Sequence, residues 1–463
     1  MKTKELIKRD PGFQYVVDHI EPMSSAGRRV LLDAPFLTSA EALEAEWERL
    51  QLATHVVMDQ PTPPHAYTDL RHCFMQLHDL QGTLDSLANH VVLNEVELFE
   101  IKNLAHLAGK SAAALSQLQL SSALPLPPLD NVFSMLDPDR TGVVNFYIYD
   151  SYDERLAPLR SQLRALQEHD GDPKQISDLL SEQADIQQQV CTRLSAMLQP
   201  LAPSLKVTLE QLAYADMLFA RAELVKQWQL SRPLIGNRMA FTQLVNPRLR
   251  DRNLALGLRY QPVDIALSQG VTLITGANMA GKTVLLKSVG IATQMAQTGM
   301  FVPAQQAEIV LVDDVVSSIG DEQNEMNGLS SYASEMLKIS QIVSRTRTAR
   351  LLVLIDEPAR TTNPVEGKAI VQALATLLQQ SSSFGLVTTH YGQLNVDCRR
   401  LRVHGFVEDL VDQPLRPDNI SLFIDYSLDE DTSDDVPHEA LRIAEILACD
   451  ATLLKEARGF LES

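Results

Sequence analysis

The chain has 463 residues and carries 40 Lys and Arg side chains against 59 Asp and Glu, a formal net charge of −19. This length suits roughly two to four domains, and the acidic balance argues against tight, nonspecific binding to duplex DNA. We find no run of about 18 apolar residues and no apolar signal segment, so we expect no membrane span and a cytoplasmic location. The four cysteines form no CxxC, which suits a reducing compartment without zinc or disulfides.

The first half of the chain reads as helical. Residues 1–30 have weak periodicity and form an N-terminal extension, whereas residues 31–235 are poor in β-branched side chains and predict a helical domain. Residues 151–198 predict a helical hairpin, because two apolar-striped arms flank the turn signal HDGDP at 169–173. Asp216 interrupts an apolar helical stripe, so we expect it to cap or pair inside the core.

Two short segments precede the hairpin. NFYIYD (145–150) predicts a short strand. DPDRTG (137–142) superficially resembles a calcium loop, but Thr141 and Ile148 stand where that loop needs an acidic or amide ligand and a bidentate Glu. We therefore interpret 137–142 as a turn.

The character of the chain changes after residue 235. Short β-rich runs alternate with amphipathic helices through residues 236–463, which predicts a mostly parallel sheet covered by helices. The acidic segment 425–435 is expected to be a solvated loop, and a last helix is expected over 437–460. The strand candidates are VTLITG, AEIVLVDDV, LLVLID and FGLVTTH. The predicted fold is thus an α/β domain preceded by a mostly α-helical one.

A phosphate-binding motif lies between a predicted strand and a predicted helix. Residues Gly276 to Thr283 read GANMAGKT, a full match to GxxxxGK[ST], with Asn278 and Gly281 inside the loop. The N–H groups of such a loop can surround a β-phosphate at a helix N-terminus. Lys282 would neutralise phosphate charge, and the Thr283 hydroxyl would ligate Mg²⁺. The motif therefore predicts ATP and Mg²⁺ as ligands, against the alternative of a plain glycine-rich turn.

Two further strand ends carry candidate catalytic groups. LLVLIDEP reads as a buried strand with Asp356 and Glu357 at its tip. A carboxylate there can hold Mg²⁺ through water, and the next one can polarise an attacking water. FGLVTTH ends in His390, where an imidazole could contact a γ-phosphate.

A serine-rich helix start lies between these sites. In MNGLSSYASEM (326–336), Ser330 and Ser331 open a predicted helix whose first N–H groups are free. Such a turn could bind a γ-phosphate, including that of another subunit. The alternative is a capped surface helix.

The order of these motifs resembles the MutS ATPases, which belong to the ABC class. The resemblance covers roughly residues 30–460, strongly in the second half and loosely in the helical half. Besides the P-loop and the serine-rich start, it is carried by GMFVPAQ (299–305), DEPAR (356–360), TTHY (388–391), LLDAPFLTSAEALEAEWERLQ (31–51), YQPVDI (260–265) and HEALRIAEILACDATLLKEAR (438–458).

The resemblance implies a homodimer of ABC-type P-loop ATPase domains, in which each subunit completes the other's site. The helical region would be the MutS core or lever domain. The implied roles are magnesium carboxylate for Asp356, general base for Glu357, γ-phosphate sensor for His390, contact across the interface for Ser330 and Ser331, proximity to metal and water for Gln305, and an aromatic contact with adenine for Tyr260.

The chain departs from this family in several places. Only about 30 residues stand where repair members carry mismatch-reading and connector domains, and no nuclease-like tail follows. Ala277 replaces the usual proline after the first P-loop glycine, and residues 358–364 read PARTTNP rather than the repair pattern. That variant is similar to MutS-like ATPases that reactivate cobalamin-dependent lysine aminomutases.

Two hypotheses compete for the partner of an ATP-gated dimer. Family membership favours a DNA-associated repair or recombination role without mismatch reading. Residues 84–200 contain eight Lys and Arg but sixteen Asp and Glu, an excess that would repel phosphates. The acidic excess therefore favours the second hypothesis, in which the dimer remodels a protein partner, such as a cobalamin enzyme. A kinase for a small metabolite is disfavoured, because no acceptor-binding segment is apparent.

Overall fold

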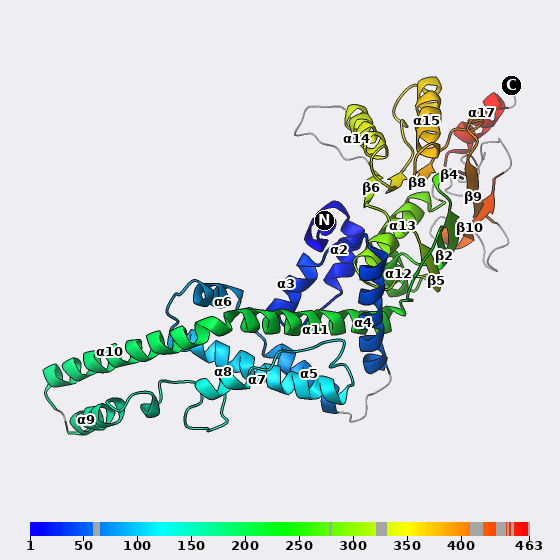
Figure 1. Ribbon diagram of the computed structural model, residues 1–463. Coiled ribbons are helices and arrows are strands. Elements are labelled where there is room, and N and C mark those ends of the chain that lie inside the picture. The colour runs from blue at the N-terminus through cyan, green and yellow to red at the C-terminus, as the bar shows by residue number, and fades with distance from the viewer. Residues whose placement is uncertain are drawn as a thin grey trace. The chain divides into compact units, whose positions relative to one another are not determined.

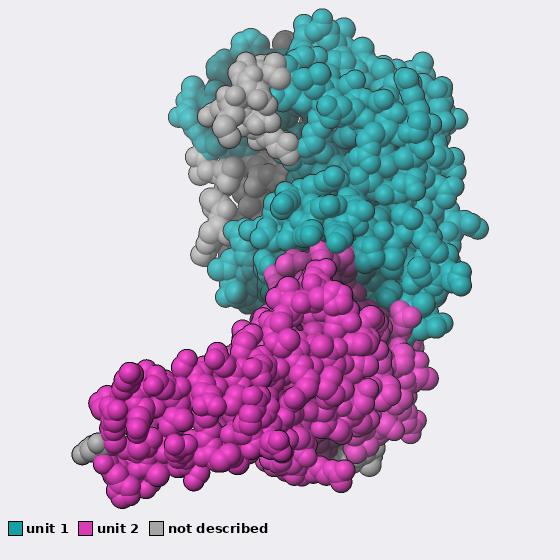
Figure 2. Space-filling model, turned by 60° about the vertical axis from the view of Figure 1, so that its left-hand side comes forward, with its two compact units in different colours: residues 1–19, 35–48, 227–463 teal, residues 20–34, 49–226 magenta. Residues whose placement is uncertain are grey.

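The computed structural model divides the chain into two compact units, which Figure 2 colours separately. Unit 1 contains residues 1–19, 35–48 and 227–463, and unit 2 contains residues 20–34 and 49–226. The structure describes residues 1–58, 65–169, 171–276, 280–320, 331–407, 420–431, 441, 444–445 and 449–461. The predicted domain limits at residues 30 and 235 stay predictions, since the two units are defined by packing and are discontinuous along the chain.

Unit 2 is built of helices around one apolar core. Its core residues come from nearly every helix of the unit, among them Leu104 of α7, Val190 of α10 and Leu209 of α11. The helices are α3 (Ser25–Asp33), α5 (His65–Met75), α6 (Gln81–Ala88), α7 (Glu95–Gln117), α8 (Asp130–Met135), α9 (Leu156–Glu168) and α10 (Pro173–Leu198), with 3₁₀ turns at Asp150–Tyr152 and Gln199–Leu201. Two more helices, α4 (Ala40–Met58) and α11 (Ala202–Trp228), contain residues of both units.

The segment expected to be a helical hairpin forms α9 and α10, which run side by side (Figure 1). Asp172 caps α10 by accepting a hydrogen bond from the Lys174 N–H at 3.1 Å, and Pro173 occupies its first position. Only one side of α10 is buried, through residues such as Ile186 and Leu194. The opposite side of the hairpin is therefore polar and exposed.

Asp216 lies buried in unit 2, where it holds Ser24, the N-cap residue of α3. Its carboxylate accepts hydrogen bonds from the Met23 N–H at 2.9 Å and from the Ser24 N–H at 2.8 Å and hydroxyl at 2.5 Å. The Ser24 hydroxyl in turn accepts from the Gly27 N–H at 2.9 Å. The expectation of a structural carboxylate in the core is confirmed.

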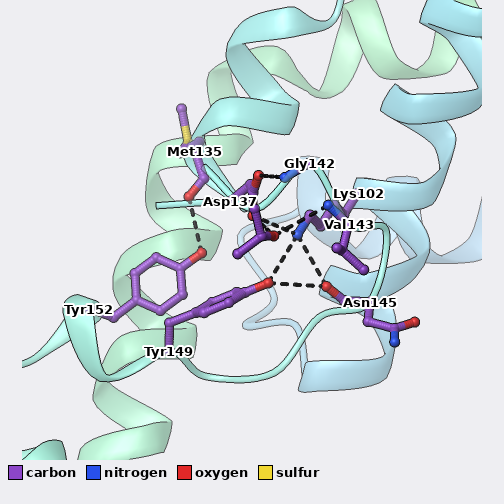
Figure 3. A network of polar contacts seen from close by, with 9 residues as sticks. Lys102, Met135, Asp137, Gly142, Val143, Asn145, Tyr149 and Tyr152 are labelled. Carbon is purple, nitrogen blue, oxygen red and sulfur yellow. Dashed lines mark hydrogen bonds and ion pairs between the residues drawn. The ribbon is translucent and has the colours of Figure 1, made fainter. Parts of the chain in front are cut away.

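The segment between α8 and α9 is a turn followed by irregular chain, and a buried lysine organises it (Figure 3). Lys102 of α7 has no exposed surface, and its ammonium donates to Asp137 at 3.3 Å, to the Asn145 carbonyl at 3.1 Å and to the Tyr149 hydroxyl at 3.2 Å. The interpretation of 137–142 as a turn is confirmed. The strand expected over 145–150 is wrong, because the Asn145 and Ile148 carbonyls accept hydrogen bonds from the side chains of Lys102 and Arg160 rather than from a neighbouring strand.

Unit 1 contains a six-stranded sheet in the order β10-β9-β4-β8-β7-β6. All neighbouring pairs are parallel except β10 with β9. Every residue of β7 and of β8 is buried, as expected for inner strands of a parallel sheet covered on both faces. The strands are β4 (Gly270–Thr275), β6 (Asp314–Ser318), β7 (Leu351–Ile355), β8 (Phe384–Thr388), β9 (Arg399–Phe406) and β10 (Ile424–Glu430).

A second sheet in unit 1 has the order β1-β5-β2-β3. Helix α13 contacts β6, β7 and β8, while α15 contacts β4 and β8. The strands are β1 (Leu234–Ile235), β2 (Met239–Leu244), β3 (Val263–Leu267) and β5 (Gln306–Ile309), and the helices are α1 (Thr3–Arg9), α2 (Pro11–Asp18), α12 (Pro247–Ala255), α13 (Lys282–Gln297), α14 (Ser331–Arg345), α15 (Pro364–Gln379) and α17 (Ala451–Leu461), with a 3₁₀ turn at Ile420–Phe423.

The structure bears on the acidic segment, the last helix and the question of membrane spans. The solvated loop expected over 425–435 is wrong for residues 425–430, which belong to β10 on the edge of the sheet, and residues 432–435 lie outside the described part of the chain. The single helix expected over 437–460 is wrong, because residues 449–450 are not helical and α17 begins only at Ala451; residues 437–440, 442–443 and 446–448 lie outside the described part of the chain. Among the described helices, none is long and apolar enough to cross a bilayer.

Candidate functional site

The predicted phosphate loop connects β4 to α13 at the carboxyl edge of the six-stranded sheet. Gly276 follows the strand with φ of 134°, and Gly281 precedes the helix with φ of 79°, conformations that favour glycine. A Cβ at Gly281 would lie 2.8 Å from the Tyr426 ring, so only glycine fits there. Asn278 lies outside the described residues.

Lys282 is the first residue of α13, and its side chain is buried at the centre of this edge. Its ammonium donates to the Gly276 carbonyl at 2.6 Å and forms an ion pair with Glu357 at 3.4 Å. The side chain is only 5% exposed, which leaves its charge weakly screened by water. The amine therefore lies beside the loop where a bound anion would place negative charge.

Asp356 follows β7 and is held by two threonine hydroxyls. Thr283 of α13 donates to one carboxylate oxygen at 2.6 Å, and Thr388 at the end of β8 donates to the other at 2.6 Å. The Asp356 N–H donates to the Ser318 carbonyl at 3.0 Å, which continues the register of β7 against β6. The structure thus brings together the two residues that the sequence predicted as metal ligands, Thr283 and Asp356.

Glu357 occupies a strained turn next to Asp356. Its φ is 44° and that of Ala359 is 60°, left-handed values that cost a residue other than glycine roughly 1–3 kcal/mol. The carboxylate lies between two cations, with Lys282 at 3.4 Å and Arg360 at 3.6 Å. The turn therefore directs a part-buried carboxylate towards Lys282 at the start of α13.

His390 follows β8 and faces the same cluster of charges. Partial burial lowers its pKa, the Glu357 carboxylate raises it, and the Lys282 and Arg360 cations lower it, with a net lowering. The imidazole is accordingly neutral near pH 7 and can both donate and accept. Its ring contacts the Tyr391 ring, with centroids 4.2 Å apart.

An apolar pocket of about 320 Å³ adjoins the loop. Tyr260 lines it, together with Leu249, Val284, Val403 and Tyr426. The Tyr260 hydroxyl accepts a hydrogen bond from the Asn246 N–H at 2.7 Å, which fixes the ring in the wall of the pocket. A flat ring system would fit between such side chains.

Hydrogen bonds connect β10, on one side of this pocket, to Gln261 in the segment before β3. The Gln261 amide donates to Asp425 at 2.7 Å and accepts from the Tyr426 N–H at 3.3 Å. Tyr426 was not predicted from the sequence, because only the pairing of β10 with β9 brings this distant residue to the loop. Thr388 was missed too, although it stands in the TTHY motif.

The remaining predicted residues are placed as follows. Gln305 is exposed, and its N–H donates to the Thr242 carbonyl of β2 at 2.9 Å. Ser331 begins α14, but its side chain is outside what the structure describes, as is all of Ser330. The suggested contacts of Gln305 with metal and water, and of the two serines with a γ-phosphate, stay predictions.

These features define the class of the protein. A parallel sheet that gathers a glycine-bounded loop, a buried lysine and an acidic pair at its carboxyl edge is typical of nucleotide-binding α/β domains. Residues 272–462 match the family model described as MutS domain V, whose members are ATPases. Residues 272–462 therefore form a domain of this MutS family of domains.

Curated relatives agree with this assignment. The chain is similar to Endonuclease MutS2 of Thermus thermophilus, with 37% identity over 190 residues, which are 40% of this chain and 24% of the relative. Endonuclease MutS2 of Halalkalibacterium halodurans is 28% identical over 335 residues, 71% of this chain and 41% of the relative. The DNA mismatch repair protein MutS of Thermus thermophilus is 33% identical over 193 residues, 42% of this chain and 23% of the relative. The chain thus spans less than half the length of these relatives.

Proposed function

We propose that the chain binds ATP with Mg²⁺ and hydrolyses it to ADP and phosphate. The observation that carries this proposal is the 2.6 Å contact of Thr283 with Asp356, beside the buried ammonium of Lys282. A hydroxyl and a carboxylate are hard oxygen donors of the kind that Mg²⁺ prefers. The donor set therefore fits this ion, which would neutralise phosphate charge when bound.

The other groups at this edge have roles that suit the same reaction. Lys282 would bind the β- and γ-phosphates together with the N–H groups of the loop. Glu357 would accept the proton of the attacking water, and neutral His390 would donate to the γ-phosphate. Tyr260 and Tyr426 would hold the adenine in the adjoining pocket.

We further propose that two copies join through their ATPase domains. Ser330 and Ser331 of one subunit would then reach the γ-phosphate bound by the other. ATP would favour the closed dimer, and hydrolysis would open it. The work available to a partner is limited to the difference in ATP affinity between the closed and open states. We expect this cycle to take place in the cytoplasm.

For the partner we propose DNA, in a repair or recombination role that needs no mismatch reader. The support is the family of the ATPase domain together with the relatives, whose names describe an endonuclease and a mismatch repair protein. The acidic excess of residues 84–200 favours the second candidate, a protein partner such as a cobalamin enzyme, because it repels phosphates. The similarity of residues 358–364 to the aminomutase-reactivating ATPases supports that candidate alone.

Glu357→Gln tests the ATPase proposal directly. The variant keeps the shape of the side chain but removes the base, so we expect kcat to fall about 10²- to 10⁴-fold while ATP still binds. Because ATP would stay intact, the dimer should accumulate, which sedimentation velocity would detect. Turnover is measured by phosphate release with Mg²⁺ and with excess EDTA.

Glu366→Gln is a matched control for this experiment. It removes an exposed carboxylate of α15, nine positions further along, and should leave turnover unchanged. Wild-type protein that releases no phosphate with Mg²⁺ would refute the proposed activity. Normal turnover in Glu357→Gln would refute only the role of Glu357 as the base and would not refute the ATPase activity.

A further inference from the structure

The turn that follows β7 needs outside support, because its backbone is strained at Glu357 and Ala359. Pro358 between them donates no hydrogen bond. Besides a local hydrogen bond from the Thr362 N–H to the Ala359 carbonyl at 3.4 Å, the main chain of the strained residues is bonded by side chains from the end of β8 and the segment after it. The Glu357 N–H donates to the Thr388 hydroxyl at 2.8 Å, and the Tyr391 hydroxyl donates to the Ala359 carbonyl at 3.1 Å.

Thr388 uses its single hydroxyl for two purposes. The oxygen accepts from the Glu357 N–H, and its proton goes to the Asp356 carboxylate at 2.6 Å. The side chain is fully buried, so no water can replace either bond at low cost. One hydroxyl therefore fixes the direction of the Asp356 carboxylate and the main chain of Glu357 together.

Tyr391 fixes the far end of the same turn. Its hydroxyl fits against Gly367 of α15, where a Cβ would lie 2.1 Å from the phenol oxygen. Glycine at this position therefore leaves the room in which Tyr391 reaches the Ala359 carbonyl. The Tyr391 ring also contacts His390, so the residue supports two of the proposed catalytic groups at once.

We propose that Thr388 and Tyr391 are positioning residues that hold Asp356, Glu357 and His390 in place for the reaction. This inference rests on the proposed ATPase function. Neither residue needs to touch ATP. Thr388 acts through Asp356 and Glu357, and Tyr391 acts through the Ala359 carbonyl and the His390 ring.

The test compares Thr388→Val, which keeps the shape but removes the hydroxyl, with Thr388→Ser, which keeps the hydroxyl. We expect kcat of Thr388→Val to fall about 10- to 100-fold, the scale expected when reacting groups move by an ångström or less. KM for ATP should change little, while more Mg²⁺ should be needed for half-maximal turnover because Asp356 is no longer oriented. Thr388→Ser should restore most of both properties.

Thr272→Val is the matched control. Thr272 lies in β4 of the same sheet, is also buried, and its hydroxyl has no hydrogen-bond partner within the described residues. The variant should behave like wild type. If it loses as much activity as Thr388→Val, or if Thr388→Ser is as defective as Thr388→Val, the effect comes from packing and the inference is wrong.

Tyr391→Phe is a second, independent test. This variant should fold normally, because Tyr391 is only partly buried and lies outside β8. It removes one hydrogen bond, and we expect a several-fold fall in kcat with an unchanged thermal unfolding midpoint. Wild-type kcat and Mg²⁺ dependence in both Thr388→Val and Tyr391→Phe would overturn the inference and leave the ATPase proposal standing. A wild-type chain without Mg²⁺-dependent turnover would overturn both.

Discussion

Lys102 shows how one buried charge can determine the course of a loop. Three oxygens surround its ammonium, from Asp137, Asn145 and Tyr149, and the Phe133 and Tyr149 rings lie 5.3 Å and 5.4 Å away. Burial would raise the pKa of Asp137, but hydrogen bonds from Thr141 and the Gly142 N–H, together with Lys102, lower it overall. The Asp137 carboxylate is therefore charged at neutral pH, and the irregular chain between α8 and α9 closes around this pair.

This arrangement makes Lys102→Met a severe change although methionine fills much the same space. It leaves the buried Asp137 without its counter-charge, so we expect unit 2 to lose about 3–5 kcal/mol of stability. Urea unfolding followed by far-ultraviolet circular dichroism measures the loss, because the described elements of unit 2 are helical.

Lys206→Met is the control for that measurement. Lys206 pairs with Asp85 in the same unit, but both side chains are well exposed, at 38% and 57%. Exposed pairs contribute about 0–1 kcal/mol, so the unfolding curve should barely move. Equal losses in the two variants would contradict the role assigned to burial.

At the scale of elements, apolar runs predicted the inner strands well. LLVLID and FGLVTTH contain β7 and β8, and VTLITG contains all of β4 except Gly270, because strands buried on both faces need continuous apolar sequence. The pattern failed where contacts between elements decide the local structure. Residues 425–430 are acidic yet form β10, since an edge strand is fixed by its pairing with β9 and tolerates charge. Residues 145–150 have strand propensity but face a buried lysine.

In the candidate site, too, local sequence patterns predicted some residues, and contacts between distant elements determined the others. Lys282, Thr283, Asp356, Glu357 and His390 could be found because each stands at the end of a recognisable strand or at the start of the helix. Thr388, Tyr391 and Tyr426 could not, because their importance depends on contacts between elements far apart in sequence. A single sequence contains motifs but does not show which hydroxyl reaches which carboxylate.

The junction between the loop and α13 supplies a prediction at this scale. Gly281→Ala would place a methyl group 2.8 Å from the Tyr426 ring in a left-handed conformation. We expect the loop and the pocket to shift apart and ATP affinity to fall about tenfold or more, equivalent to ~1.4 kcal/mol. Titration with a fluorescent ATP analogue measures the affinity.

Gly142→Ala is the control for Gly281→Ala, because it introduces backbone strain without a steric conflict. Gly142 has φ of 69°, but a Cβ there would meet nothing within 4 Å, and it lies in unit 2. The same backbone penalty should therefore leave ATP affinity unchanged. An unaltered affinity in Gly281→Ala would show that Tyr426 does not restrict the loop.

At the scale of the whole molecule, the charge of the chain bears on which of the two proposed partners it binds, DNA or another protein. The chain carries a net charge of −19, and residues 84–200 have twice as many acidic as basic side chains. If DNA meets unit 2, the few cations of this unit have to act together against its acidic excess. Each phosphate neutralised steepens the dependence of binding on salt.

We therefore predict that duplex or branched DNA binds with micromolar or tighter affinity only when a non-hydrolysable ATP analogue is present. The affinity should fall steeply as salt rises from 50 to 200 mM, the range in which about six to ten phosphate contacts cost 10³- to 10⁵-fold. Fluorescence anisotropy across a salt series, with and without the analogue, makes the measurement.

A charge variant in the hairpin identifies where such contacts are made. Arg164 and Lys174 are exposed on α9 and α10, so changing both to Gln should reduce the slope of log affinity against log salt by about two if both meet phosphates. Lys455→Gln, an exposed charge of α17, is the control and should leave the slope unchanged. Absence of binding at low salt would eliminate DNA as the partner, and the acidic helical unit would then be explained by a protein partner with a basic surface.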